Sequence, residues 1–245
     1  MSHNKLISIA TIAWAKNESE ALLLKRSLSA LAALGLPVFV TDAGSGEDFR
    51  SFLQSFPHFH LTPAPVRGVF AQARQSLEAA YHHGSSYILY TEPDKEFFFS
   101  QFLEPMLQGL ENPGETGILL ASRNAEGFSS FPAFQQMTET AINNCCAEVL
   151  GQQLDYTYGP FLLRAGLVPM IAQLEEDPGW GWRPFAFGLA RRLGLPIQSF
   201  EAAFTCPPGQ EQDDAGERFY RIRQLKENLQ GLLLSKSFEL KKPEE

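Results

Sequence analysis

The chain has 245 residues, of which 44% are hydrophobic and 20% are charged, and its formal net charge at pH 7 is −8. This length is sufficient for one large domain with a substantial core, and the composition is that of an ordinary soluble globular protein. The acidic balance argues against nucleic acid as a partner, because nonspecific binding of a phosphate backbone requires clustered Lys and Arg.

The cysteines and the N-terminal region bear on the cellular compartment. Cys145, Cys146 and Cys206 have neither the spacing of metal ligands nor that of a disulfide framework, which suits a reducing compartment. The first residues lack the long apolar run of a signal peptide, and charged residues and a proline interrupt the apolar stretch over 21–40. We therefore expect a cytoplasmic protein without a membrane-spanning segment.

The first 110 residues alternate β-forming runs with segments of helical periodicity. Strands are predicted over 6–14, 37–41, 58–62 and 87–91, and helices over 19–34, 47–55, 69–83 and 97–110. Four strands that alternate with helices are typical of a mainly parallel central sheet covered by helices on both faces. The sequence therefore predicts the α/β fold class.

A glycine-containing turn, Asp42-Ala-Gly-Ser-Gly46, follows the second predicted strand. Its glycines, Gly44 among them, allow the backbone to turn sharply and to approach a ligand closely. A carboxylate at a strand end, such as that of Asp42, can accept hydrogen bonds from a ribose hydroxyl or a base. The alternative is an ordinary strand-to-helix turn in which Ser45 caps the next helix. The turn lacks the spacing of a dinucleotide fingerprint or a P-loop.

The helix predicted after Gly68 carries one basic residue near its apolar stripe. Its apolar residues recur with a 3.6-residue period, and Arg74 lies one position away from them. Arg74 could reach a phosphate at the edge of the sheet, or it could flank the core. The sequence alone leaves both alternatives open.

Two carboxylates follow the fourth predicted strand. The apolar run Tyr87–Thr91 leads directly into Glu92 and Asp94, which are separated by one proline. Ligands of open α/β sheets bind outside the carboxyl ends of the strands. Two carboxylates at this spacing could share one hard divalent cation, which would take its remaining ligands from water and a diphosphate. The alternative is that both acids cap the following helix.

Four segments together resemble a known family in their order and spacing. They are Asn17-Glu18 after the first strand, Asp42-x-Gly-Ser-Gly after the second, Ala73-Arg74 in the third helix and Glu92-x-Asp94 after the fourth strand. This pattern resembles the GT-A fold glycosyltransferases, especially family 2, over about residues 6–196. The resemblance implies a GT-A-like (Rossmann-like) domain over 1–200, with a donor half over about 1–122 and an acceptor half over about 123–200.

The resemblance also implies a role for each of these residues. By analogy, Glu18, Asp42 and Gly44 would bind the nucleotide of a nucleotide sugar, and Arg74 would approach its diphosphate. Glu92 and Asp94 would bind a divalent cation, Mn²⁺ or Mg²⁺, so that Asp94 takes part in catalysis. The sequence departs from the family in having Glu rather than Asp as the first acid and Lys95 after the second. Lys95 could lend its charge to the diphosphate, or it could face solvent.

The second half of the chain is less regular. Strands are predicted over 115–122 and 196–200, and helices over 131–150 and 184–193. The segment Asp155-Tyr-Thr-Tyr-Gly-Pro160 resembles the acceptor-side segment of the family. Asp155 would then act as a catalytic or acceptor-binding residue, and Gly159 would let a sugar approach the backbone. The alternative is a short strand and turn with an exposed acid.

A tryptophan-containing segment, Gly179-Trp-Gly-Trp182, also resembles the family. Trp180 and Trp182 could bind the acceptor by stacking on sugar faces, or they could belong to the core and its rim. In inverting relatives, acids immediately after such a segment supply the general base. Arg183 and Pro184 occupy those positions here, so the expected base is absent.

Three explanations for the absent base remain open. Another acid, Asp155 or Asp177, deprotonates the acceptor; the enzyme retains configuration and the departing phosphate takes the proton; or the chain binds nucleotide sugars without catalysis. Only the first explanation requires Asp155 or Asp177 to reach the acceptor.

The C-terminal part combines a predicted loop with a predicted helix. The loop, over 205–217, is rich in proline, glycine and acids, and the helix follows over 218–234. Arg218 and Arg221 share a helical face that could bind a diphosphate or could form a solvated charged face. We expect residues 201–245 to form a lid over the donor site and the tail over 241–245 to be disordered.

The sequence therefore predicts a glycosyltransferase that moves a sugar from a nucleotide-diphosphate sugar to an acceptor, with a divalent cation on the diphosphate. The alternatives are a noncatalytic nucleotide-sugar-binding protein of the same fold and a nucleotidyltransferase, which also uses acids on an α/β sheet. The donor base, the sugar, the acceptor and the stereochemical outcome are not identified by the sequence.

Overall fold

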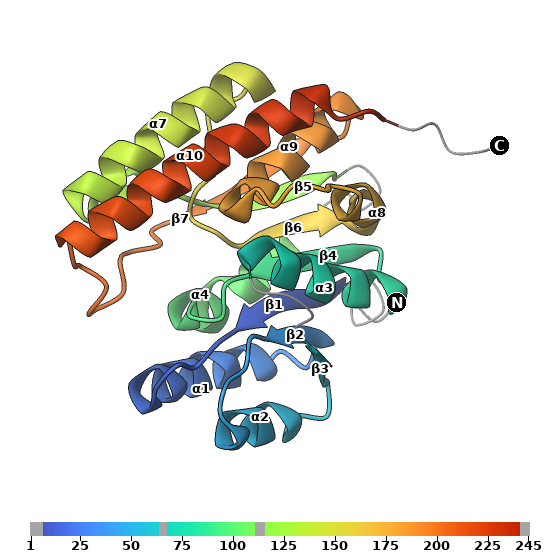
Figure 1. Cartoon of the computed structure of the whole chain (residues 1–245), viewed down its shortest axis with the longest axis vertical. Coiled ribbons are helices and arrows are strands. Elements are labelled where there is room, and N and C mark those ends of the chain that lie inside the picture. Colours follow the sequence, from blue (N-terminus) through green and yellow to red (C-terminus); the bar gives the residue numbers. More distant parts are fainter. Residues whose placement is uncertain (1–6, 64–67, 111–115, 241–245) are drawn as a thin grey trace.

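The computed structural model describes residues 7–63, 68–110 and 116–240 (Figure 1). Within these residues, one sheet lies between layers of helices. Its strands are β1 (Ile7–Ala13), β2 (Val38–Asp42), β3 (Phe59–Pro63), β4 (Tyr87–Thr91), β5 (Ile118–Arg123), β6 (Phe161–Arg164) and β7 (Ile197–Ala202). The helices are α1 (Glu18–Ala32), α2 (Glu47–Gln54), α3 (Val69–His82), α4 (Glu96–Gln101), α5 (Leu103–Gln108), α6 (Ala125–Ser129), α7 (Ala133–Leu150), α8 (Val168–Ala172), α9 (Trp182–Arg192) and α10 (Ala215–Ser237), with a short 3₁₀ helix η3 (Gly179–Gly181) before α9.

The sheet has the strand order β3-β2-β1-β4-β6-β5-β7. Strands β1, β2, β3 and β4 run parallel, whereas β6 is antiparallel to both β4 and β5. In the register of β1 and β4, Thr11 lies opposite Thr91. The carboxyl ends of these two central strands therefore lie side by side, which is where α/β sheets bind their ligands.

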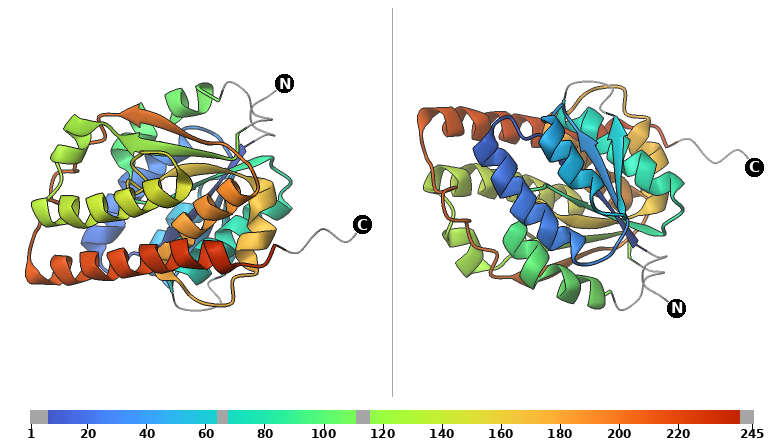
Figure 2. Two further views of the ribbon diagram at one scale, coloured as in Figure 1. Left: turned by 90° about the horizontal axis from the view of Figure 1, so that it is seen from above. Right: turned by 90° about the horizontal axis from the view of Figure 1, so that it is seen from below.

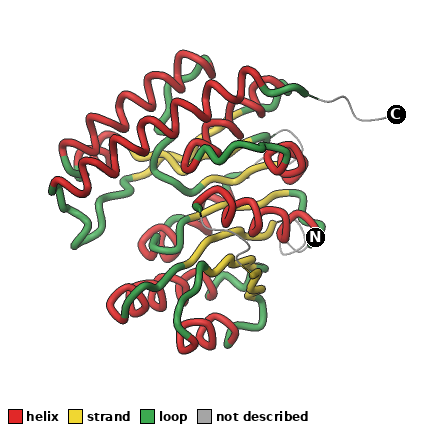
Figure 3. The backbone as a smooth tube through the Cα atoms, in the orientation of Figure 1, coloured by secondary structure: helices red, strands yellow, loops and turns green. Residues whose placement is uncertain are grey.

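The helices cover both faces of the sheet. Successive strand residues point to opposite sides, and the apolar side chains on each side are buried under helices. Ile88 and Tyr90 of β4 pack in one core with residues of α3, α7 and α9, whereas Tyr87 and Leu89 pack in a second core with residues of α1 and α4. Figures 2 and 3 show the strands enclosed between these two helical layers. Among the helices of the described residues, none is both long and apolar enough to cross a membrane.

The long helix α10 packs closely on the segment that begins α9. A Cβ atom at Gly231 of α10 would overlap the backbone of Gly181, and one at Gly181 would overlap the carbonyl of Glu227. Only glycine permits such a close approach of two backbones. Figure 1 shows α10 lying beside α7 and α9. This packing fixes the C-terminal half of α10 against η3 and α9.

Most predicted elements are confirmed within a few residues, and the strand over 87–91 agrees at both ends. The helix predicted over 97–110 is wrong in one respect, because it is divided into α4 and α5. Pro105 explains the break: it lacks an N–H, and its ring conflicts with continued helix at residue 101, four positions earlier. The short elements β6, α6 and α8 were not predicted, because four or five residues carry too little periodicity. The predictions for residues 6 and 115 and for 241–245 lie outside the described residues.

Candidate active site

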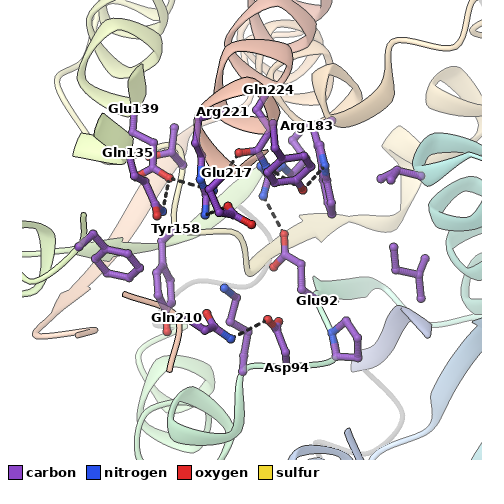
Figure 4. A pocket seen from close by; sticks show the side chains of 18 of the residues that line it. Glu92, Asp94, Gln135, Glu139, Tyr158, Arg183, Gln210, Glu217, Arg221 and Gln224 are labelled. Atoms are coloured by element: carbon purple, nitrogen blue, oxygen red, sulfur yellow. Dashed lines mark hydrogen bonds and ion pairs between the residues drawn. The ribbon is translucent and has the colours of Figure 1, made fainter. Parts of the chain in front are cut away.

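A cavity of about 680 Å³ opens at the carboxyl ends of β1 and β4. Trp14 follows β1 on one side, and Glu92, Asp94 and Lys95 follow β4 on the floor. Side chains of α7 and α10 form the opposite wall (Figure 4). Volumes of this order are typical of small-molecule binding sites.

Glu92, Asp94 and Lys95, which follow β4, all line the cavity, but their surroundings differ from one to the next. Asp94 Oδ2 accepts a hydrogen bond from Gln210 Nε2 at 3.3 Å, and Lys95 Nζ lies 5.1 Å from the centre of the Tyr158 ring. Glu92 Oε1 accepts a hydrogen bond from Arg183 Nη1 at 2.8 Å. Glu92 Oε2 is buried and has no hydrogen-bond partner among the described residues. Of the three residues after β4, Glu92 forms an ion pair, whereas Asp94 and Lys95 form none with the described residues.

Arg183 is the functional candidate that the sequence did not identify. It stands in the first turn of α9, it is 5% exposed, and it lines the cavity. The guanidinium lies 5.0 Å from the centre of the Trp180 ring and forms the ion pair with Glu92. In the sequence, position 183 drew attention only because it holds an arginine where inverting relatives carry an acid. Its partner lies 91 residues earlier, so no local pattern could have revealed the pair.

A second ion-pair cluster borders the cavity at the α7 wall, where Arg123 and Glu139 line the cavity and Asp155 does not. Arg123 Nε donates to Asp155 Oδ2 at 2.6 Å, and its Nη2 donates to Glu139 Oε2 at 2.7 Å. Burial opposes the charge on Arg123, but Glu139 and Asp155 outweigh it and raise the pKa of the guanidinium. Burial also opposes ionisation of Asp155, yet the charge and hydrogen bonds of Arg123 lower the pKa of this carboxyl to about 2.

The position of Asp155 differs from that expected of a residue that contacts the acceptor. Its carboxylate also accepts hydrogen bonds from Asn143 Nδ2 at 3.0 Å and Thr157 Oγ1 at 2.7 Å, and its side chain is only 6% exposed. Asp155 is not among the residues that line the cavity. Because donors occupy both oxygens, this acid is placed to fix Arg123 rather than to deprotonate or bind an acceptor.

The lowered pKa of Asp155 predicts a pH dependence of stability. The unfolded carboxyl titrates near 3.8 and the folded one at about 2. The contribution, about 2 kcal/mol, should be fully present above pH 4 and should be lost as the pH falls through 2. Urea unfolding of the wild type and of Asp155→Asn between pH 2 and 6 tests this. The slope should be smaller in the variant, and equal slopes would contradict the assignment.

Trp182 and Gly159 also differ from their expected roles. Trp182 is completely buried and packs edge-on against Tyr90 with ring centres 4.6 Å apart, so its rings are closed to a sugar. Gly159 has a φ of 128°, and a Cβ atom there would overlap the Glu92 carboxylate. The glycine is therefore required by Glu92 rather than by an approaching acceptor. Trp180, in contrast, is half-buried and lines the cavity.

Several predicted donor residues lie outside the cavity lining. Asp42 accepts hydrogen bonds from the backbone N–H and the hydroxyl of Ser45, whose Oγ in turn accepts from the N–H of Ala15 at 2.8 Å. Asp42 and the turn at Gly44, where φ is 106°, thus hold the chain that leaves β1. Glu18 is exposed at the start of α1, and the residue that lines the cavity there is Glu20.

The basic residues Arg74 and Arg218 also lie away from the cavity, whereas Arg221 lines it. Arg74 Nη1 donates to the carbonyl of Ala172 at 3.5 Å, so it joins α3 to α8. Arg218 is exposed and pairs with Asp213 at 3.0 Å. Arg221 lies within 3.7 Å of Glu217 and 4.0 Å of Glu139. The helical spacing of Arg218 and Arg221 therefore does not bring both to one ligand.

The chain was compared with known proteins. No family model and no curated protein matches it. Solved structures of glucosyl-3-phosphoglycerate synthase from Mycobacterium tuberculosis do match. The complex with uridine diphosphate is 15% identical with a TM-score of 0.65, and the complex with phosphoglyceric acid is 16% identical with a TM-score of 0.66. A third complex, with Mn²⁺, UDP-glucose and phosphoglyceric acid, is 14% identical with a TM-score of 0.63.

Each of these matches covers 96% of this chain and 81% of the solved one. Similarity over nearly the whole chain confirms the predicted GT-A fold with its mainly parallel sheet. At this level of identity the likeness establishes the fold, and the activity has to be argued from the side chains of the cavity.

Proposed function

We propose that the chain is a glycosyltransferase that moves a sugar from a nucleotide-diphosphate sugar to an acceptor. The observation that carries the proposal is the pair Asp94 and Lys95 on the floor of the cavity, at the carboxyl end of β4. Lys95 is the cavity-lining cation that forms no ion pair within the described residues, so it is available to a diphosphate. The structural similarity to enzymes solved with uridine diphosphate and UDP-glucose supports the same activity.

The donor nucleoside is proposed to bind beside Trp14, at the end of β1. Trp14 is 51% exposed and lines the cavity, as does Glu20 from the first turns of α1. An exposed aromatic ring can stack on a base, and a carboxylate can accept hydrogen bonds from ribose hydroxyls. Asp42 would act indirectly, because its hydrogen bonds with Ser45 hold the segment that carries Trp14.

A divalent cation, Mn²⁺ or Mg²⁺, fits Asp94 better than Glu92. No group of three or more His, Cys, Asp or Glu side chains in the described parts of the chain could hold a metal by itself. Asp94 faces the cavity, and Glu92 keeps one oxygen without a hydrogen-bond partner, while Arg183 neutralises the other. A cation held here would need ligands from the donor diphosphate and water, and it would supply Lewis-acid stabilisation of the leaving group.

The proposed reaction needs no protein base. The acceptor oxygen forms a bond to the anomeric carbon, the bond from that carbon to the diphosphate breaks, and the hydroxyl proton passes to the departing diphosphate with retention of configuration. Asp155 is engaged by Arg123, and Asp177 Oδ1 accepts from the N–H of Gly179 and lies outside the lining. Neither acid suggested by the sequence is therefore placed to act as a base.

The noncatalytic alternative has one specific observation in its favour, namely that Arg183 stands where inverting relatives carry an acid and neutralises Glu92. The discriminating experiment is calorimetric titration of UDP-, GDP- and ADP-sugars with and without Mn²⁺, followed by an assay for release of the nucleoside diphosphate. Donor binding followed by transfer supports the transferase. Donor binding without transfer supports the noncatalytic alternative. For either function we propose a cytoplasmic location.

Lys95→Gln is expected to weaken donor binding. An amide of similar length preserves packing against Tyr158 but removes the charge. Loss of one charge-assisted contact to phosphate costs about 1.4 kcal/mol, so the donor Kd should rise about tenfold. Calorimetric titration measures the change. The matched control is Lys226→Gln, which alters an exposed lysine of α10 outside the cavity and should leave the Kd unchanged.

A further inference from the structure

We infer that the wall of the cavity formed by α7 and α10 binds an uncharged, hydroxyl-rich acceptor, a sugar or a polyol, rather than a phosphorylated or carboxylated one. The inference rests on the proposed transfer reaction and names the substrate class of the same site. It follows from two properties of this wall, which are the side-chain amides that line it and the internal pairing of its charges.

The first property is the number of amides. Gln135 of α7 and Gln224 and Asn228 of α10 line the wall together with Tyr220 (Figure 4 labels Gln135 and Gln224). An amide carries both hydrogen-bond donors and an acceptor, and a sugar hydroxyl requires both. Hydrogen bonds hold the amides in place, since Gln224 Nε2 donates to Tyr220 Oη at 3.2 Å and Asn228 Nδ2 donates to the carbonyl of Gln224 at 2.7 Å. The wall thus presents oriented groups suited to hydroxyls.

The second property is that the basic residues of the wall are already neutralised. Arg221 lies between Glu217 and Glu139, at 3.7 and 4.0 Å, and it donates to Gln224 Oε1 at 2.9 Å. Figure 4 shows Glu217 and Glu139 beside Arg221.

Glu139 Oε2 also accepts a hydrogen bond from Arg123 Nη2 at 2.7 Å, and the Glu139 side chain is only 8% exposed. An anionic acceptor would have to displace one of these carboxylates or lie close to it, and like charges in a partly buried site repel strongly. A neutral polyol meets no such cost, because carboxylate oxygens accept hydrogen bonds from hydroxyls.

The contrast with the cavity floor strengthens the inference. Lys95, beside Asp94, has no carboxylate partner in the described chain, whereas Arg123, Arg183 and Arg221 each have at least one. The cavity therefore offers its uncommitted positive charge where the donor diphosphate is proposed to bind. Its opposite wall offers amides and paired charges, which complement a neutral acceptor.

The test uses the full-length protein with each of UDP-, GDP- and ADP-glucose, and with glucose, glycerol, glucose 6-phosphate and glucuronic acid as acceptors. We expect transfer to a neutral acceptor with kcat/KM at least ten times that of the anionic compounds. Transfer that favours either anionic compound over both neutral ones would overturn the inference. Absence of donor binding, or donor binding without transfer to any of the four acceptors, would instead overturn the proposed function, so the two failures are distinguishable.

Glu217→Gln tests the charge argument directly. Removing this carboxylate releases Arg221 from one partner, so kcat/KM for glucose 6-phosphate relative to glucose should rise about tenfold, mainly through a lower KM. Glu148→Gln is the matched control, since Glu148 is exposed on α7 and does not line the cavity. Thermal midpoints should remain equal. An unchanged ratio in Glu217→Gln would show that the paired charges do not select the acceptor.

Discussion

Asp94→Ala is expected to reduce sugar transfer by at least ~100-fold and to remove the effect of Mn²⁺ on donor binding. Asp94 faces the cavity from the end of β4, and its carboxylate accepts a hydrogen bond from the Gln210 amide. It is therefore the side chain best placed to hold a cation on the leaving diphosphate. Initial rates at saturating donor and titrations with and without Mn²⁺ measure both effects.

The control for this experiment is Asp48→Ala, which removes an exposed acid from the first turn of α2, outside the cavity. Activity should be unchanged in this variant. The thermal midpoint of Asp94→Ala should stay near that of the wild type, because the acid makes a single long hydrogen bond. Full turnover in Asp94→Ala would contradict both the proposed cation site and the role of the β4 end in transfer.

Arg123→Met is expected to lower the free energy of unfolding by about 3–5 kcal/mol. The guanidinium side chain is 1% exposed and pairs with Asp155 and Glu139, whose side chains are 6% and 8% exposed. Methionine would leave two buried carboxylates without their counter-charge. This loss should greatly exceed that of an exposed pair, which contributes about 1 kcal/mol or less. Urea unfolding followed by circular dichroism provides the measurement.

Arg50→Met supplies the matched control. Arg50 is 48% exposed and lies 3.9 Å from Asp42, so its replacement should change the free energy of unfolding by less than about 1 kcal/mol. If Arg123→Met does not fold, Asp155→Asn replaces it, since the amide keeps some hydrogen bonds but removes one charge. An effect of Arg123→Met no larger than that of Arg50→Met would show that the buried cluster does not stabilise the fold.

The local pattern of the sequence determined the main architecture. Buried strands such as Tyr87–Thr91 are continuous apolar runs, and helices such as α3 carry apolar residues with a 3.6-residue period. Both signals depend on neighbours in the chain, so both are visible without a structure. The same holds for Glu92, Asp94 and Lys95, because residues that follow a central parallel strand must emerge at the ligand-binding edge.

Only the tertiary structure decided what surrounds these residues. Arg183 reaches Glu92 across 91 positions, Gln210 reaches Asp94 across 116, and Arg123 reaches Asp155 across 32. Such pairs form because elements far apart in the chain pack together, and no period or local spacing encodes them. The packing of α9 on the sheet buries Trp182, whereas the end of β5 and helix α7 engage Asp155. Side-chain chemistry was thus predictable from sequence where the backbone alone positions a residue, and unpredictable where a distant charge or ring completes its environment.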